Sequence, residues 1–156
     1  MSMQTKLSTL WIFATLNYLY CDVTGLMDPA MLKQYLAGNL GGLQMTQGFL
    51  LATAIFVEIK VSMVLLSRLL GHRANRWANI AAGAFMTLVT VATLPFGFGL
   101  TGYYAFFAVI EVATTSYIAW SAFKWSETDV RPGLRDRQSL AAASLDSEPL
   151  RTPQQA

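Results

Sequence analysis

Long apolar stretches separated by short polar segments dominate the chain up to Trp125. A helix that crosses the hydrocarbon core of a bilayer needs about 20 mostly apolar residues. Four stretches meet this requirement, at residues 7–26, 46–70, 77–98 and 103–125. The third contains no charged residue, whereas Asn17 and Asp22 interrupt the first. The pattern predicts an all-α fold in which residues 1–125 form a four-helix transmembrane bundle.

The segment between the first two predicted spans has the pattern of a short amphipathic helix. Asp28 is placed to cap a helix that begins at Pro29, and Gly38 with Asn39 ends it. We expect this helix to lie flat on the outer surface, because one of its faces is apolar. It either covers the mouth of the bundle or gates the access of a substrate. That face consists of Met31, Leu32, Tyr35 and Leu36.

The apolar pattern stops after Trp125. Residues 126–156 are rich in Ser, Arg, Asp, Gln and Pro, a composition typical of disorder. We expect a disordered cytoplasmic tail, either solvated throughout or with a short helical turn near residues 139–145 that binds a partner.

Charge supports a membrane location and sets the orientation. Charged residues make up 13% of the chain, against about 25% in an average soluble domain, which excludes an ordinary soluble domain. Basic loop residues stay on the cytoplasmic side. With the N-terminus inside, nine of the eleven Lys and Arg residues lie on the inner side, leaving Lys33 outside and Lys60 within a span. Both termini are therefore expected in the cytoplasm.

Basic and aromatic residues gather where the second and third spans meet the inner surface. Arginine contacts lipid headgroups and tryptophan prefers the membrane interface. We expect these residues to anchor the orientation; specific binding of an anionic lipid is the alternative. They are Arg68, Arg73, Arg76 and Trp77.

No motif points to catalysis or to a cofactor. Cys21 is the only cysteine, so the chain has no internal disulfide or redox pair. His72 is the only histidine, so one chain cannot supply two axial histidines to haem. No spacing fits a zinc site, and no basic run with interleaved aromatics fits a nucleic acid. We expect a non-enzymatic protein without a metal, a cofactor or a nucleic-acid partner.

Polar residues within membrane spans are costly and need an explanation. Helical rise places one such residue of each span roughly 15–18 Å from one surface, in a core about 30 Å thick. On the second, third and fourth spans this residue shares a helix face with small or polar neighbours, which predicts that these faces point inward. The four residues are Asn17, Glu58, Thr87 and Glu111.

This polar layer has two interpretations. Glu58, Glu111 and Asn17 either line a small cavity that binds a cation, a proton or a small polar molecule, or they are hydrogen-bonded groups that set the helix register. Lys60 lies about 200° around the helix from Glu58, so the two cannot pair. It either extends to the surface or pairs with Glu111 of the fourth span.

Spaced residues resemble a family of small bacterial four-helix membrane proteins catalogued as a domain of unknown function. The resemblance covers about residues 7–125 and rests on four stretches of sequence. It implies four helices in a bacterial plasma (inner) membrane and offers no activity. Lys60 departs from the family pattern, in which an uncharged residue is expected. The stretches are 7–11 (Leu-Ser-Thr-Leu-Trp), 20–22 (Tyr-Cys-Asp), 73–80, and 106–111 with its Phe-Phe and Ile-Glu pairs.

Two functional hypotheses follow. The first is a small carrier or binding protein whose polar layer holds a proton or a small ligand, acting as a homodimer because four helices are few for a pore. The second is an accessory or scaffold subunit that binds an unknown membrane partner through its basic inner face and tail. In both, the lipid bilayer surrounds the helices.

Overall fold

Five α-helices and one small hairpin make up the residues that this computed structural model describes, 2–94 and 101–125. All of them belong to one compact unit, Met1–Trp125. The all-α prediction is confirmed. Residues 95–98 of the predicted third span and the predicted tail 126–156 lie outside the described residues. The elements are α1 (Met3–Met27), α2 (Pro29–Leu36), β1 (Asn39–Leu40), β2 (Leu43–Gln44), α3 (Gln47–Leu69), α4 (His72–Thr93) and α5 (Gly102–Lys124).

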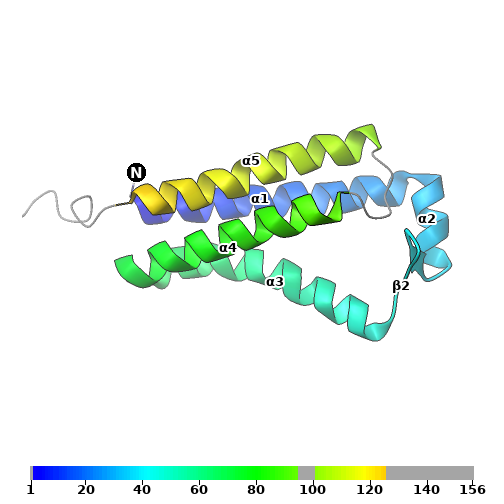
Figure 1. Cartoon of the computed structure of the whole chain (residues 1–156), viewed down its shortest axis with the longest axis horizontal. Helices are drawn as coiled ribbons and strands as arrows, with labels where there is room; N and C mark the ends of the chain where they lie inside the picture. The colour runs from blue at the N-terminus through cyan, green and yellow to red at the C-terminus, as the bar shows by residue number, and fades with distance from the viewer. Residues whose placement is uncertain (1, 95–100, 126–156) are drawn as a thin grey trace, which may run out of the picture. The chain divides into compact units, whose positions relative to one another are not determined.

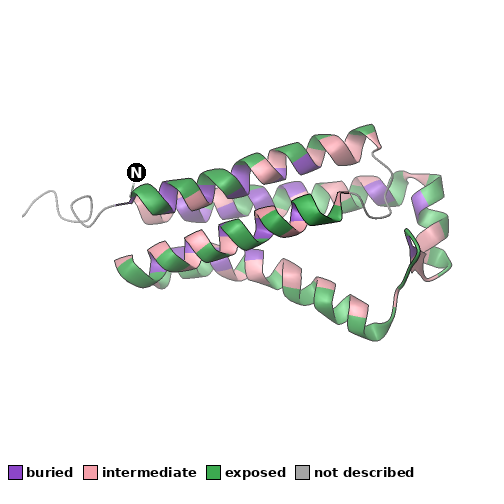
Figure 2. Ribbon diagram, viewed as in Figure 1, coloured by how far each residue is buried: buried purple, intermediate pink, exposed green. Residues whose placement is uncertain are grey.

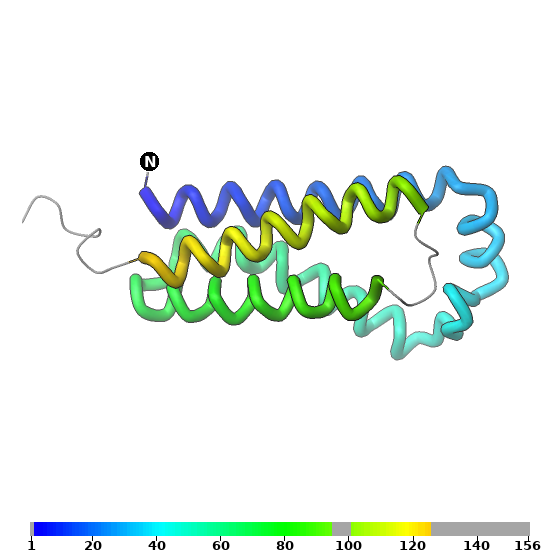
Figure 3. The backbone as a smooth tube through the Cα atoms, turned by 45° about the horizontal axis from the view of Figure 1, so that its top comes forward, coloured from blue at the N-terminus to red at the C-terminus, as the bar shows by residue number. Residues whose placement is uncertain are grey.

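The four long helices lie side by side, and α2 with the hairpin lies at one end of them (Figures 1 and 3). The opposite end is basic. There, Gln4 of α1 donates to the Leu70 carbonyl after α3 (3.2 Å), and Arg76 of α4 donates to the Phe123 carbonyl of α5 (2.9 Å). The chain therefore runs up and down between two ends. We call the residues Lys6, Arg68, Arg73, Arg76 and Lys124 the basic end.

Capping side chains fix where several helices begin. Thr46 accepts from the backbone of Phe49 before α3, and Ser2 accepts from the backbone of Thr5 before α1. The third apolar stretch begins at residue 77, whereas α4 already begins at His72, directly after Gly71. The polar residues at the start of α4 are helical too. The apolar stretch predicted only the part of the helix that is suited to a membrane.

The predicted short helix is present as α2, and Asp28 caps it by accepting from the backbone of Ala30 (2.9 Å). Of its apolar face, Met31 is buried, whereas Leu36 is exposed. The hairpin that follows was not predicted. Gly41 and Gly42 have φ values of 55° and 90°, the positive values that a two-residue hairpin turn requires. The Gly-Gly pair between two leucines is its sequence signature.

The packed core lies toward the basic end. It consists of Leu7, Trp11, Met63, Met86, Ile118 and Trp125. The buried residues of α3 are Lys60, Met63 and Ser67, all in the second half of the helix. The first half of α3 diverges from the other long helices (Figure 1) and carries no buried residue (Figure 2). A space therefore opens toward α2.

Two helices, α3 and α5, are long and apolar enough to cross a membrane. Only 11% and 33% of their most apolar windows are buried inside the protein. The helices α1 and α4 are more polar and do not meet the same criterion. They nevertheless carry large apolar side chains that are exposed, including Phe13 and Leu16 on α1 and Phe85 and Leu88 on α4.

α4 and α5 approach each other closely at Gly83. A Cβ atom there would lie 2.9 Å from the Thr115 carbonyl oxygen and 3.2 Å from the Ala119 backbone nitrogen. Gly83→Ala is therefore expected to lower the free energy of unfolding by about 1–3 kcal/mol, because the two backbones must separate. Thermal unfolding followed by circular dichroism in detergent measures the change.

The matched control is Gly48→Ala in α3, where the nearest atom to a new Cβ is the Thr46 hydroxyl at 3.9 Å. This change should be neutral or stabilising, because alanine favours helix more than glycine does. Equal effects of the two substitutions would contradict the close approach at Gly83.

Candidate binding cavity

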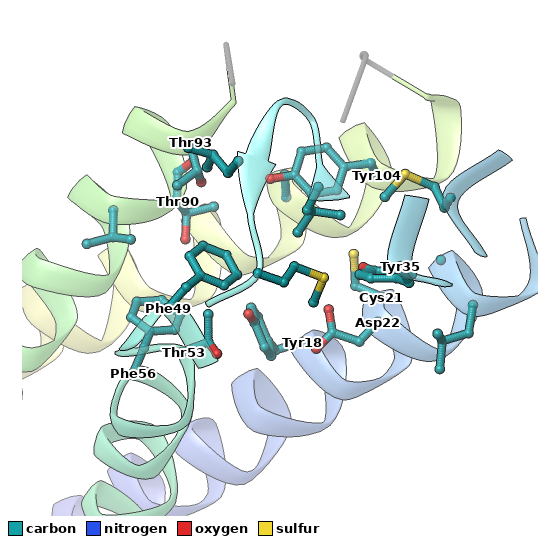
Figure 4. Close-up of a pocket in the computed structure, with 18 of the residues that line it drawn as sticks. Tyr18, Cys21, Asp22, Tyr35, Phe49, Thr53, Phe56, Thr90, Thr93 and Tyr104 are labelled. Carbon is teal, nitrogen blue, oxygen red and sulfur yellow. The ribbon is translucent and has the colours of Figure 1, made fainter. Parts of the chain in front are cut away.

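A cavity of about 570 Å³ opens where the first half of α3 diverges from α1, α4 and α5. This volume is in the range that accommodates small-molecule ligands. Figure 4 shows side chains from several elements pointing into it: Tyr18 from α1, Tyr35 from α2, Phe49 from α3, Thr90 from α4 and Tyr104 from α5. Residues of α2 and the hairpin line the mouth.

Six aromatic rings contribute to the cavity walls. The rings of Tyr18 and Phe56 pack against each other with centroids 5.8 Å apart and planes tilted by 59°. The remaining lining is mostly apolar, with the thiol of Cys21 among it. The aromatic residues are Tyr18, Tyr35, Phe49, Phe56, Tyr103 and Tyr104.

Glu111 belongs to the cavity lining and forms an ion pair with Lys60, which lies behind it; we call this part of the cavity the closed end. Lys60 is fully buried, Glu111 is 6% exposed, and the Lys60 ammonium donates to the Glu111 carboxylate. The ammonium also lies 3.8 Å from the centre of the Tyr18 ring and 4.8 Å from that of Phe56. The predicted alternative in which Lys60 pairs with Glu111 is confirmed. Its surroundings satisfy the buried charge with one carboxylate and two aromatic faces.

The prediction that Glu58 faces inward is wrong. Glu58 is exposed on α3, where it accepts a hydrogen bond from Ser62 (3.3 Å). Lys60 lies on the opposite side of the helix and points inward. It shares this buried face with Met63 and Ser67. The reason is electrostatic: the buried partner of Glu111 is a cation, and turning Glu58 inward would bring two carboxylates together.

Asn17 and Thr87 face the interior as predicted but bind to α5 rather than to each other. The Asn17 amide donates to the Phe107 carbonyl (3.1 Å), and the Thr87 hydroxyl lies 2.8 Å from that of Thr115. Each joins two helices by hydrogen bonding, which is what the structural interpretation of the polar layer expects. Of the four predicted residues, only Glu111 lines the cavity.

Asp22 is a cavity residue that sequence reasoning left out of the site. It follows Tyr18 by one helical turn, so the two side chains lie together on the cavity wall (Figure 4). Across the mouth, burial raises the pKa of Tyr35, and the negative charge of Asp22 raises it further. Its position near the end of the first apolar stretch suggested only a solvated charge; the face shared with Tyr18 and Cys21 was the available indication.

A second buried polar cluster lies near the basic end and was not predicted. The side-chain oxygen of Asn79 accepts from the Trp11 indole (2.7 Å) and the Ser67 hydroxyl (3.2 Å). Its amide donates to the side chain (2.6 Å) and the carbonyl (2.9 Å) of Asn75. All four residues are fully buried. This cluster joins α1, α3 and α4 beneath the core and leaves the opposite end to the cavity.

The predicted anchor residues all lie at the basic end. Arg68 donates to the Ser8 hydroxyl (3.0 Å), Arg76 to the Phe123 carbonyl, and Arg73 is exposed. Trp77 is 70% exposed. Their role as membrane anchors stays a prediction.

Comparison with known proteins identifies a family and no function. The model of a family of unknown function (DUF6326) matches residues 2–131. No curated protein and no solved structure matches the chain.

Proposed function

Because the chain belongs to a family of unknown function (DUF6326), we propose from its geometry that it is a four-helix integral membrane protein that binds a small molecule in its cavity. The observation that carries the proposal is the buried Lys60–Glu111 pair at the closed end of that cavity. An ionisable pair inside a membrane protein is expensive to maintain and commonly marks a functional site.

The exposed surface supports a membrane location for all four long helices. Among the described residues 27 large apolar or aromatic side chains are exposed, and all but Leu32, Leu36 and Leu43 belong to these four helices. A soluble monomer rarely exposes so much apolar surface, whereas lipid would cover it. The gathering of Arg and Lys at one end supports an orientation with that end, and hence the N-terminus, in the cytoplasm.

The composition of the cavity supports binding of an organic molecule. Its walls are mainly apolar and aromatic, and its few polar groups converge from different helices, a combination typical of ligand sites. In the described part of the chain, Asn17 and Thr87 each hydrogen-bond to α5, but Asp22 makes no hydrogen bond or ion pair. The cavity therefore keeps a polar group available for a ligand.

Filling the cavity tests the proposal. Thr53 lines it from the first half of α3, where no residue is buried, so Thr53→Trp fills the space without displacing packed neighbours. We expect the wild-type protein to require detergent for extraction from the membrane fraction and to carry a small molecule, detected by mass spectrometry of a solvent extract. The variant should lose that molecule.

The control is Ala54→Trp, the same change one residue further on, at an exposed position. It should retain the bound molecule. Identical extracts from the wild type and both variants would contradict the binding function, and recovery of the chain without detergent would contradict the membrane location.

A further inference from the structure

We propose that the cavity takes a lipophilic organic cation, such as a hydrophobic amine or a quaternary ammonium compound, with Asp22 as its counter-ion. This inference rests on the proposed binding function and specifies its ligand class. Three observations carry it: the charge of the lining, the aromatic walls, and the way in which the protein's own ammonium group is held at the closed end.

The lining is acidic. Asp22 and Glu111 contribute carboxylates, and no Lys, Arg or His belongs to the lining among the residues that the structure describes. Lys60 lies behind Glu111, fully buried, and neutralises it. One net negative charge, that of Asp22, therefore remains. A ligand anion would face this charge without a partner, whereas a cation would be attracted to it.

The walls present aromatic faces beside that charge. Tyr18 adjoins Asp22 on α1, and Tyr35 is close enough for the Asp22 charge to affect it. Tyr103 and Tyr104 complete this part of the lining. Asp22 itself is exposed, and aromatic faces attract cations through their quadrupole at exposed sites as well.

Lys60 shows how this environment holds an ammonium group. It pairs with one carboxylate and lies against the faces of Tyr18 and Phe56. The outer part of the cavity repeats this combination with Asp22 and tyrosines, but none of the described residues places a cation there. A bound cation would lie beside Asp22 and the tyrosines in the same way as the Lys60 ammonium lies beside Glu111, Tyr18 and Phe56.

The apolar remainder of the cavity selects an organic cation over an inorganic one. A metal ion needs several oxygen, nitrogen or sulfur ligands, and no group of three His, Cys, Asp or Glu side chains converges in the described part of the chain. The roughly 570 Å³ of mostly apolar space instead suits a hydrocarbon or aromatic body attached to the charge.

Two ions of nearly equal size and opposite charge provide the test. Cys21 lines the cavity and is the only cysteine of the chain, so its rate of reaction with N-ethylmaleimide reports occupancy. With the full chain in detergent, tetraphenylphosphonium should slow this reaction about tenfold more than tetraphenylborate does at the same concentration. Asp22→Asn should remove the preference for the cation.

Asp28→Asn is the matched control, because Asp28 caps α2 outside the lining and asparagine is an equally good cap. It should retain the preference. Equal protection by both ions would overturn the cation inference while leaving the binding function intact. Protection by neither ion would also overturn the cation inference. The binding function would then be tested separately by comparing the extracts of the wild type and Thr53→Trp. An undiminished preference in Asp22→Asn would overturn the assignment of Asp22.

Discussion

Lys60→Met is expected to lower the free energy of unfolding by about 3–5 kcal/mol, the usual cost of leaving one member of a buried ion pair without its partner. Methionine nearly matches the length of the lysine stem, so packing against Tyr18 and Phe56 should change little. The loss arises from the Glu111 carboxylate, which is 6% exposed and has no other cation beside it among the described residues. Thermal or denaturant unfolding in detergent measures it.

The double variant Lys60→Met/Glu111→Gln separates the charge from the packing. It removes both ionised groups together, so it should recover most of the stability that the single variant loses, to within about 1–2 kcal/mol of the wild type. Lys33→Met on exposed α2 is the control and should change stability by less than about 0.5 kcal/mol. If the losses measured for Lys60→Met and for Glu111→Gln alone simply add in the double variant, the two charges do not stabilise each other.

The sequence predicts the helices because their causes are local. Apolar runs of sufficient length and capping residues such as Thr46 and Asp28 lie within each element. The same local information placed Asn17 and Thr87 on inward faces, because small and polar residues on otherwise apolar helices mark contacts between helices. The same local rules would also have predicted the hairpin, from the adjacent glycines Gly41 and Gly42.

The orientation of α3 could not be obtained in this way. Both sides of this helix are apolar, so hydropathy does not distinguish a lipid-facing side from an interior one, and the polar stripe through Glu58 pointed to the wrong side. What turns Lys60 inward is Glu111, which lies 51 residues further along the chain. A charge count made this pairing conceivable, but only the packing of α3 against α5 decides it.

The cavity is harder to predict from the sequence than any single contact is. Its lining comes from five helices and the hairpin, and it exists because the first half of α3 diverges from its neighbours. Tyr18, Cys21 and Asp22 share one helix face, a pattern that equally fits packing against a neighbouring helix. The space in front of that face is a property of the tertiary arrangement, and so is the fact that no basic residue of the described part of the chain lines it beside Asp22.

Asn79→Leu should cost about 2–4 kcal/mol of unfolding free energy, because it leaves buried donors without acceptors. The Asn79 oxygen accepts from the Trp11 indole and the Ser67 hydroxyl, and every member of this cluster is fully buried. The Ser67 hydroxyl can turn to a carbonyl of its own helix. The Trp11 N–H has no such alternative, so it accounts for most of the loss. Asn17→Leu is the comparison, since it removes the single hydrogen bond to the Phe107 carbonyl and should cost less.

A double-mutant cycle with Trp11→Phe isolates the central bond of this cluster. Phenylalanine keeps an aromatic ring but carries no N–H, so Trp11→Phe should be less harmful in the Asn79→Leu protein than in the wild type, by about 1 kcal/mol. Since Trp11 lies on α1 and Asn79 on α4, this coupling measures how firmly the cluster holds those helices together at the end opposite the cavity. An identical cost of Trp11→Phe in both proteins would show that the hydrogen bond contributes nothing to holding α1 against α4. The rigidity of this end would then have to come from the apolar core around Met63 and Ile118 alone.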